Sequence, residues 1–171
     1  MEKYDQDSFH FFYRQEDFMS QWYLKSFCIE EITFNCVEQF IMYKKAMLFG
    51  DNTIANKILK EQHPGNQKRL GRLVKNFRSN IWEKSRFEIS YEGNYAKFNQ
   101  NQDLCSLLLE TRDKIIAEAS PTDLIWGIGY GMENENKYCI YKWRGKNLLG
   151  KVLMQVREDL KNSVNIKNSK V

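Results

Sequence analysis

The feature that most constrains the fold is the stretch NCVEQFIMYKKAM at residues 35–47, which is apolar almost all the way round a helix. Asn35 is a good N-cap and Gly50 is typical of a residue that ends a helix, so the pattern predicts one helix between them. Glu38 and Lys45 are seven residues apart, which returns them to one face, about 10 Å apart along the axis. A glutamate and a lysine within an apolar stripe are paired, solvated at a rim, or directed at a ligand.

Both residues have a structural explanation beside a functional one. With Asn35 as N-cap, Glu38 occupies the third helical position, where a glutamate closes a capping box. Lys45 lies several residues before the helix end that favours a cation, and Lys44 is there as well. Its stem can still lie along apolar surface with the ammonium in water. The local pattern therefore leaves both explanations open for each residue.

Helix caps and helix-breaking residues divide the rest of the chain, and helices dominate. We expect short strands and loops up to about residue 33. Beyond the first helix, the predicted elements are helices at 51–62, 66–75, 80–98, 103–112 and 147–161, strands at 114–119 and 138–143, and a helical turn after Ser120–Pro121. The helix at 80–98 is weakened by Gly93. The predicted fold class is mainly α, or α+β with a few short strands.

Composition bounds the function. The 171 residues predict a single domain, 1–171, with a core at about 11–160 and a flexible tail at 162–171. A net charge of +4 suits a phosphate-bearing ligand but is no nucleic-acid signature by itself. The four scattered cysteines and two histidines argue against zinc, a disulfide framework and a serine-histidine-acid site. With no signal peptide or transmembrane stretch, a reduced cytoplasmic location is the default expectation.

A basic segment, HPGNQKRLGR, is a candidate phosphate site. Lys68 and Arg72 stand at i and i+4 on one helical face, and Gly71 allows a close backbone approach. Arginine binds phosphate through a planar fork and lysine binds it as a point charge. A solvated basic helix surface explains the same pattern, since one K-x-x-x-R is a weak signal.

A glycine-containing loop, SPTDLIWGIGYG, is the second candidate. Ser120 and Asp123 have the spacing of a capping box, which is the structural explanation for Asp123. The glycines fit neither a dinucleotide-binding fingerprint nor a phosphate-binding P-loop. The loop could still wrap a ligand, with Trp126 and, from the helix at 80–98, Trp82 and Tyr95 as candidate rings on which a base stacks.

Taken in order, these stretches resemble the NADAR family, with its YbiA-like fold, over residues 11–160. The matching segments are FMSQWYLKSF, VEQFIMYKKAMLFGD, HPGNQKRLGR, NFRSNIW, KFNQN, LLLET, EASPTDLIWGIG and WRGKNLLGKVLMQVR. No one segment is decisive, but their order over nearly the whole chain is specific. Gln21 stands where the family's F-S-N-F-Y motif tends to have asparagine.

The resemblance implies an N-glycosidase. Some members are similar to an enzyme that cleaves phosphoribosylamino-pyrimidine intermediates of riboflavin synthesis, and others to enzymes that remove ADP-ribose from guanine in DNA. Both linkages join the anomeric carbon of a sugar to an exocyclic amine. Such an aminal can open to an imine, and a neutral lysine can then displace the base as a Schiff base that water hydrolyses. Apolar surroundings lower the pKa of a lysine and so favour its neutral form.

On this interpretation Lys45 is the nucleophile, Glu38 shuttles protons and Asp123 orients the sugar or water. The substrate-binding residues implied with them are Lys68, Arg72, Gly71, Trp82 and Trp126. Direct attack by water between two carboxylates is the alternative route. No cofactor and no metal are expected. The expected partner is a small phosphorylated nucleoside-like substrate or ADP-ribosylated DNA, without a membrane, and the oligomeric state is left open.

Three rival interpretations stay open. Acting on ADP-ribosylated guanine in DNA requires a basic surface that runs out of the pocket and a salt-sensitive affinity. A non-catalytic module that binds ADP-ribose or a nucleotide would keep its affinity in a Lys45→Ala variant. A purely structural role would pair Glu38 and Lys45 with other residues in a filled core.

Overall fold

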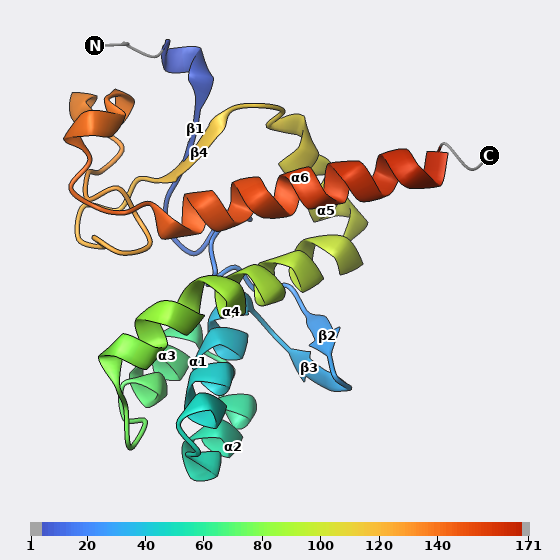
Figure 1. The fold of residues 1–171 in the computed structure, drawn as a ribbon, viewed down its shortest axis with the longest axis vertical. Helices are drawn as coiled ribbons and strands as arrows, with labels where there is room; N and C mark the ends of the chain where they lie inside the picture. Colours follow the sequence, from blue (N-terminus) through green and yellow to red (C-terminus); the bar gives the residue numbers. More distant parts are fainter. Residues whose placement is uncertain (1–4, 169–171) are drawn as a thin grey trace. The chain divides into compact units, whose positions relative to one another are not determined.

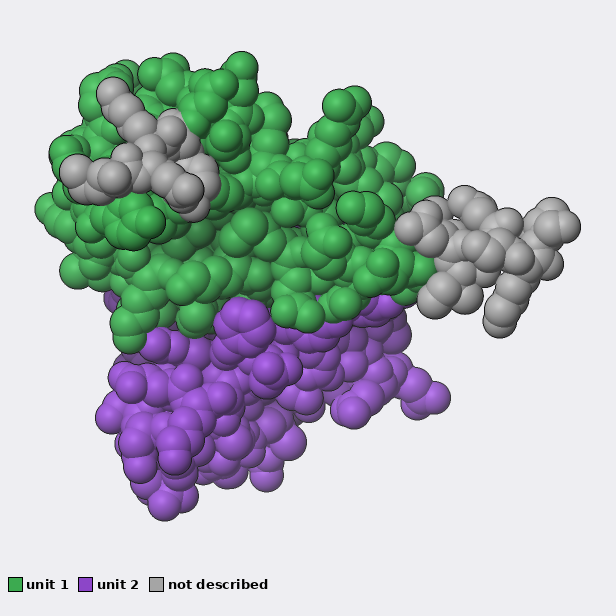
Figure 2. All heavy atoms as spheres, turned by 45° about the horizontal axis from the view of Figure 1, so that its top comes forward, with its two compact units in different colours: residues 1–20, 102–171 green, residues 21–101 purple. Residues whose placement is uncertain are grey.

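The computed structural model describes residues 5–168, with side chains up to residue 163, and the chain divides into two compact units. One unit is residues 21–101, and the other combines residues 1–20 with 102–171 (Figure 2). The described residues hold six α-helices and four short strands, so the predicted mainly α class is confirmed. The single-domain boundary stays a prediction, and each unit is described by itself.

The unit of residues 21–101 is a helical cluster with one small hairpin (Figure 1). Its first helix, α1, packs against each of the other three helices. The elements are β2 (Phe27–Ile29), β3 (Ile32–Phe34), α1 (Val37–Leu48), α2 (Asn52–Lys60), α3 (Pro64–Gly71) and α4 (Ser79–Gln100). This central position explains why the helix predicted from residues 35–47 is apolar on most sides.

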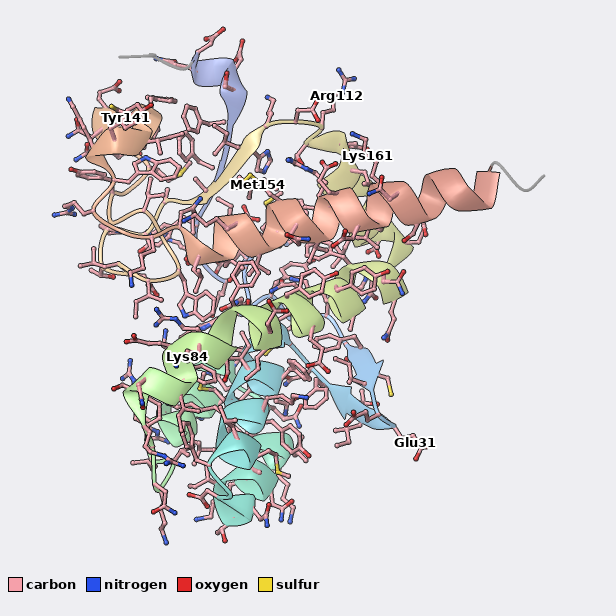
Figure 3. The ribbon with its side chains drawn as sticks, viewed as in Figure 1. Glu31, Lys84, Arg112, Tyr141, Met154 and Lys161 are labelled. Carbon is pink, nitrogen blue, oxygen red and sulfur yellow. The ribbon has the colours of Figure 1, made fainter. Side chains whose placement is uncertain are left out.

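The hairpin of β2 and β3 has a two-residue turn that the residue types in the sequence do not predict. The strands are antiparallel with Ile29 opposite Ile32, and Glu30 and Glu31 between them both have positive φ, 50° and 64°. Positive φ at both central residues is the requirement of a type I′ turn, which Asn-Gly usually fills. Glu31 is labelled at the tip of the hairpin in Figure 3.

A glycine sets how closely α4 approaches α1. The rings of Phe27, Phe34 and Phe40 form the centre of this core, with ring centroids 5.0–6.2 Å apart. A Cβ atom at Gly93 would lie 2.7 Å from the Phe40 ring, closer than carbon atoms can pack. Gly93, which the sequence predicts to weaken this helix, is therefore the residue that lets α4 pack against Phe40.

The chain between the helices is held by caps, of which the sequence predicts one correctly. Asp51 caps α2 by accepting a hydrogen bond from the Ile54 N–H, and its second oxygen accepts from the Lys75 N–H. These two hydrogen bonds, from Lys75 first, lower the pKa of the Asp51 carboxyl. The HPG stretch, in contrast, begins α3 at Pro64 and does not merely end α2, so the helix predicted at 66–75 starts earlier and ends at Gly71.

The second unit contains a parallel strand pair and two helices. β1 (Phe9–Phe12) pairs in parallel with β4 (Ile115–Glu118), with Phe9 opposite Ile115. The helices are α5 (Gln102–Glu110) and α6 (Leu148–Asn168), and α6 packs against β4. α6 extends beyond its predicted end at residue 161. Of the predicted flexible tail, residues 169–171 lie outside the described residues.

Two local predictions in this unit are wrong. The segment expected to be a strand at 138–143 contains two short 3₁₀ helices, η2 (Glu135–Tyr138) and η3 (Ile140–Lys142); a third, η1 (Gln6–Ser8), precedes β1. Aromatic and β-branched residues there suggested a strand, but among the described residues the segment pairs with neither sheet. After Ser120–Pro121 the chain makes bends and no helical turn. No helix within residues 5–168 has the length and apolar character to cross a membrane.

Candidate active site

Glu38 does not close a capping box, which corrects the structural explanation offered by the sequence. The N-cap of α1 is Cys36, with no side-chain cap, so Glu38 is the second helical residue. Gln39 stands in the third position, and its side-chain oxygen accepts the Asn35 N–H at 2.8 Å. The Asn35 side chain donates to the Gln62 carbonyl instead. Gln39 therefore performs the local capping task, and the Glu38 carboxylate is available for other contacts.

The Glu38 carboxylate is nearly buried, with 4% of its surface exposed, at the first turn of α1. The indole N–H of Trp22 donates to its Oε2 at 3.2 Å. The Glu38 backbone N–H donates to the Gln21 carbonyl at 2.8 Å, so the segment before β2 also holds the start of the helix. Gln21 in turn donates from its side chain to the Ser90 hydroxyl on α4 at 2.7 Å. Trp22 thus holds the carboxylate, and Gln21 links the backbone of Glu38 to α4.

Lys45 is half-buried on the same face of α1. Its Nζ donates to the Gly71 carbonyl, at the end of α3, at 2.8 Å. The ammonium also lies over two rings, 4.4 Å from the Phe77 centroid and 5.6 Å from that of Trp82. A carbonyl and two π faces position the amine, and no carboxylate of the described residues forms an ion pair with it.

The pKa of Lys45 is lowered from its ordinary value. Burial is the largest cause, because it disfavours the charged ammonium. The Glu38 carboxylate acts in the opposite direction and raises the pKa, while the Arg72 guanidinium lowers it further. Because the Glu38 carboxylate changes the pKa of Lys45, the two charged groups lie close enough to interact electrostatically. A lowered pKa raises the fraction of neutral amine, the form that acts as a nucleophile.

The helix α3 brings the predicted phosphate-binding residues to this region. Lys68 places its Nζ 5.5 Å from the Trp22 ring centroid, so Trp22 contacts both Lys68 and Glu38. Arg72 is exposed and near enough to Lys45 to lower its pKa. A Cβ at Gly71 would lie 2.0 Å from the sulfur of Met42, so its close approach is to α1. That approach brings the Gly71 carbonyl to Lys45.

Asp123 and Trp126 belong to the other unit. One oxygen of Asp123 accepts from the N–H groups of Ile125 and Trp126, at 2.9 and 2.7 Å, and the Ser120 hydroxyl accepts the Asp123 N–H. These are the contacts of a tight turn. The roles predicted for Asp123 and Trp126 in the reaction stay predictions.

Comparison with known proteins decides the family. The pattern that defines the NADAR domain matches residues 11–161. The chain belongs to the NADAR family. Its fold is similar to the NMR structure of the E. coli protein YbiA, with a TM-score of 0.75, 27% sequence identity, and coverage of 94% of this chain and 89% of that one. The predicted family and its YbiA-like fold are confirmed.

Two relatives of this NADAR chain carry informative names. It is 51% identical over 122 residues to N-glycosidase R617 of Acanthamoeba polyphaga mimivirus, covering 71% of this chain and 72% of that protein. It is 33% identical over 122 residues to the riboflavin biosynthesis protein PYRR, chloroplastic, of Zea mays, which covers 67% of this chain and 18% of that protein.

The candidate site contains residues that the sequence alone did not single out. Trp22 and Phe77 contact Glu38 and Lys45 through space, from segments more than ten residues away in the chain. The quoted motif FMSQWYLKSF does contain Trp22, but nothing local links an indole to a carboxylate sixteen positions later. Contacts of this kind depend on the packing of α1 against its neighbours.

Proposed function

We propose that this NADAR protein hydrolyses the bond between the exocyclic amine of a base and a phosphorylated ribose, as in the phosphoribosylamino-pyrimidine intermediates of riboflavin synthesis. Hydrolysis of an N-glycosyl bond is the activity that the family and the name of the mimivirus relative support. The choice of a riboflavin intermediate draws on the name of the maize relative. It also draws on the cations of α3 beside the candidate site.

The observation that carries the proposal is the state of Lys45. A half-buried amine with a lowered pKa, under the electrostatic influence of a buried carboxylate on the same helix face, is suited to imine chemistry. In the proposed reaction the sugar ring opens to an imine at C1, and the Lys45 nitrogen adds to that carbon. The bond from C1 to the base nitrogen then breaks, and a Schiff base remains. Water adds to C1 and releases the sugar and the lysine.

Glu38 would move the protons in this sequence. The departing base nitrogen needs a proton, and the water that attacks the Schiff base must lose one. A carboxylate held by the Trp22 indole can take part in both transfers without leaving its position. Lys68 and Arg72 are proposed to bind phosphate, Trp82 to contact the substrate beside Lys45, and Asp123 and Trp126 to orient and stack the substrate.

The test is to incubate the protein with 5-amino-6-(5-phosphoribosylamino)uracil, with and without sodium borohydride, and to follow the products by mass spectrometry. Release of the free pyrimidine supports the N-glycosidase assignment. Borohydride should convert the Schiff base to a stable amine, which adds the sugar phosphate to a peptide containing Lys45. Release of the pyrimidine without a borohydride adduct would favour direct attack by water. If no pyrimidine is released, the substrate assignment is wrong.

A second substrate, ADP-ribosylated guanine in DNA, is favoured by one specific observation. From residue 62 to residue 82 the chain has five cations and no acidic residue. Four of these cations are exposed: Arg69, Arg72, Lys75 and Arg78. Such a segment beside Lys45 suits a substrate carried on a phosphate backbone. The affinity for an oligonucleotide would then fall steeply between 50 and 200 mM salt.

We also propose a reducing, cytoplasmic setting. The four cysteines are free thiols in the structure, and burial raises the pKa of Cys36 to about 12. Thiols that remain unpaired are typical of reduced compartments.

A further inference from the structure

Arg86, in the second turn of α4, is buried in a way that the fold alone does not explain. Only 7% of its surface is exposed. Among the described residues, its side chain makes no hydrogen bond, ion pair or ring contact. The exposed Glu83, one helical turn earlier, forms no ion pair with it. A guanidinium carries five N–H donors, and burying it without an acceptor is unfavourable.

The guanidinium is nevertheless reachable. Fully enclosed polar atoms without a hydrogen-bond partner occur at a few described residues, and no nitrogen of Arg86 is among them. These nitrogen atoms therefore keep some contact with solvent, and a small anion could reach them as well. Buried charges in proteins are normally paired, so an unpaired one that remains accessible points to a ligand.

The position of Arg86 along α4 connects it to the candidate active site. Trp82 precedes it by four residues and Ser90 follows it by four, so each shares a helix face with Arg86. The Trp82 ring lies 5.6 Å from the Lys45 Nζ. The Ser90 hydroxyl accepts from Gln21, whose carbonyl accepts the Glu38 N–H. Arg86 is thus flanked on its own helix by one residue that contacts Lys45 and another that is linked to Glu38.

We propose that Arg86 binds the phosphate monoester on the ribose of the substrate. An arginine fork matches two phosphate oxygens and forms charge-assisted hydrogen bonds, which are stronger when shielded from water. Binding would supply the counter-charge that Arg86 lacks. This inference rests on the proposed N-glycosidase function and adds a residue that the sequence did not indicate. It also gives Arg86 a larger part in phosphate binding than the exposed Arg72.

The experiment measures binding of ribose 5-phosphate and of ribose to the full chain by isothermal titration calorimetry. The variants are Arg86→Gln, Arg86→Lys and a matched control, Lys84→Gln. Lys84 is an exposed cation on the same helix, labelled in Figure 3. Far-UV circular dichroism checks that each variant is folded. An oligonucleotide without ADP-ribose serves as a phosphodiester probe.

We expect the parent protein to prefer ribose 5-phosphate over ribose by about 10- to 100-fold, the effect of charge-assisted hydrogen bonds. Arg86→Gln should remove this preference, Arg86→Lys should restore part of it, and Lys84→Gln should leave it unchanged. Equal binding of the two sugars by the parent, no detectable binding of either, or an unchanged preference in Arg86→Gln overturns the proposal. If Arg86→Gln weakens the binding of the oligonucleotide alone, the proposal is also overturned, because Arg86 would then bind a phosphodiester of a nucleic-acid strand and not a phosphate monoester.

Turnover separates this inference from the function on which it rests. If Arg86→Gln loses its preference for the phosphorylated sugar while the parent fails to cleave the aminal, the assigned reaction is wrong and the phosphate site stands. If the parent cleaves the aminal and Arg86→Gln does so with an unchanged KM, the reaction stands and the phosphate assignment fails.

Discussion

Two arginines in the described chain are almost fully buried, one in each compact unit, and their surroundings differ. Arg157 on α6 is 5% exposed, and its Nη1 donates to the Thr111 hydroxyl and the Lys114 carbonyl, both at 2.9 Å. Arg86 on α4 is 7% exposed and has no such partner among the described residues. The same residue type joins structural elements in one unit and lacks an acceptor in the other. Burial by itself does not distinguish a structural charge from one that binds a ligand.

The contrast extends to other buried polar groups of the two units. Asn147, just before α6, donates to the Ile116 carbonyl and accepts the Glu118 N–H, so it ties the helix to β4. In the other unit, Glu38 and Lys45 are ionisable groups that contact an indole and a backbone carbonyl. Asn147 completes the hydrogen bonding of backbone groups, whereas the contacts of Glu38 and Lys45 hold two ionisable groups in position. Substitutions in the two sets should therefore affect different measurements.

The largest expected effect is on catalysis, at Lys45. Lys45→Ala should lower turnover of the aminal substrate by about 10³-fold or more, because it removes the proposed nucleophile. The control is Lys44→Ala, which removes the neighbouring cation. The Lys44 ammonium forms an ion pair with Glu92 at 3.3 Å, and its loss should change turnover less than about twofold. Steady-state rates from product release decide between them. Equal losses in both variants would show that helix charge, and not the Lys45 amine, supports the reaction.

Glu38→Gln should lower turnover by about 10²-fold, as expected when a proton-transfer group is removed. It should also move the pH profile. The Glu38 carboxylate raises the pKa of Lys45, so removing its charge lowers that pKa further and favours the neutral amine at lower pH. The rising limb of kcat against pH should shift toward lower pH. A shift toward higher pH, or none, would contradict the electrostatic coupling of the two groups.

Arg157→Met should act on stability and not on the reaction. It leaves the Lys114 carbonyl and the Thr111 hydroxyl without their buried donor, which costs about 2 kcal/mol of unfolding free energy. Lys151→Met, at an exposed position on the same helix, should change it by less than about 0.5 kcal/mol. Urea denaturation followed by circular dichroism measures both. If Arg157→Met leaves the unfolding free energy unchanged, Arg157 does not stabilise the fold and the contrast with Arg86 fails.

The matched change, Arg86→Met, should have the smallest effect on the stability of the ligand-free protein. Because the guanidinium has no partner among the residues that the structure describes, the unfolding free energy should stay the same or rise by up to about 1 kcal/mol. The same urea denaturation gives the value. A loss as large as that of Arg157→Met would mean that Arg86 serves the fold, and the two arginines would no longer differ.

Local chemistry in the sequence predicted several elements correctly. Asp51 caps α2, Gly50 has the positive φ, 72°, of a residue that ends a helix, and the strand at 115–118 forms as expected. Each of these depends on residues within a few positions of one another. The hairpin turn at Glu30–Glu31 escaped prediction because neither residue favours positive φ. Its conformation follows from the pairing of the flanking strands.

The candidate site shows the same division. Helical periodicity alone placed Glu38 and Lys45 on one face, since both lie in α1. It did not identify Trp22 or Phe77, which contact Glu38 and Lys45 from other segments, or Arg86, for which a role is proposed above. The capping box that it left open as one explanation for Glu38 is wrong, because Gln39 stands in the third helical position. The length of a helix and the residue at its cap decide such details, and tertiary contacts adjust both.

By itself the sequence determined the helical class, the family and the shared face of Glu38 and Lys45, because these follow from local spacing and from the order of motifs. The tertiary structure decided how those residues are used. Burial lowers the pKa of Lys45, the Trp22 indole holds Glu38, and Arg86 has no acceptor within the described part of the chain. Desolvation and hydrogen bonding between distant segments are properties of the packed chain, and no local pattern contains them.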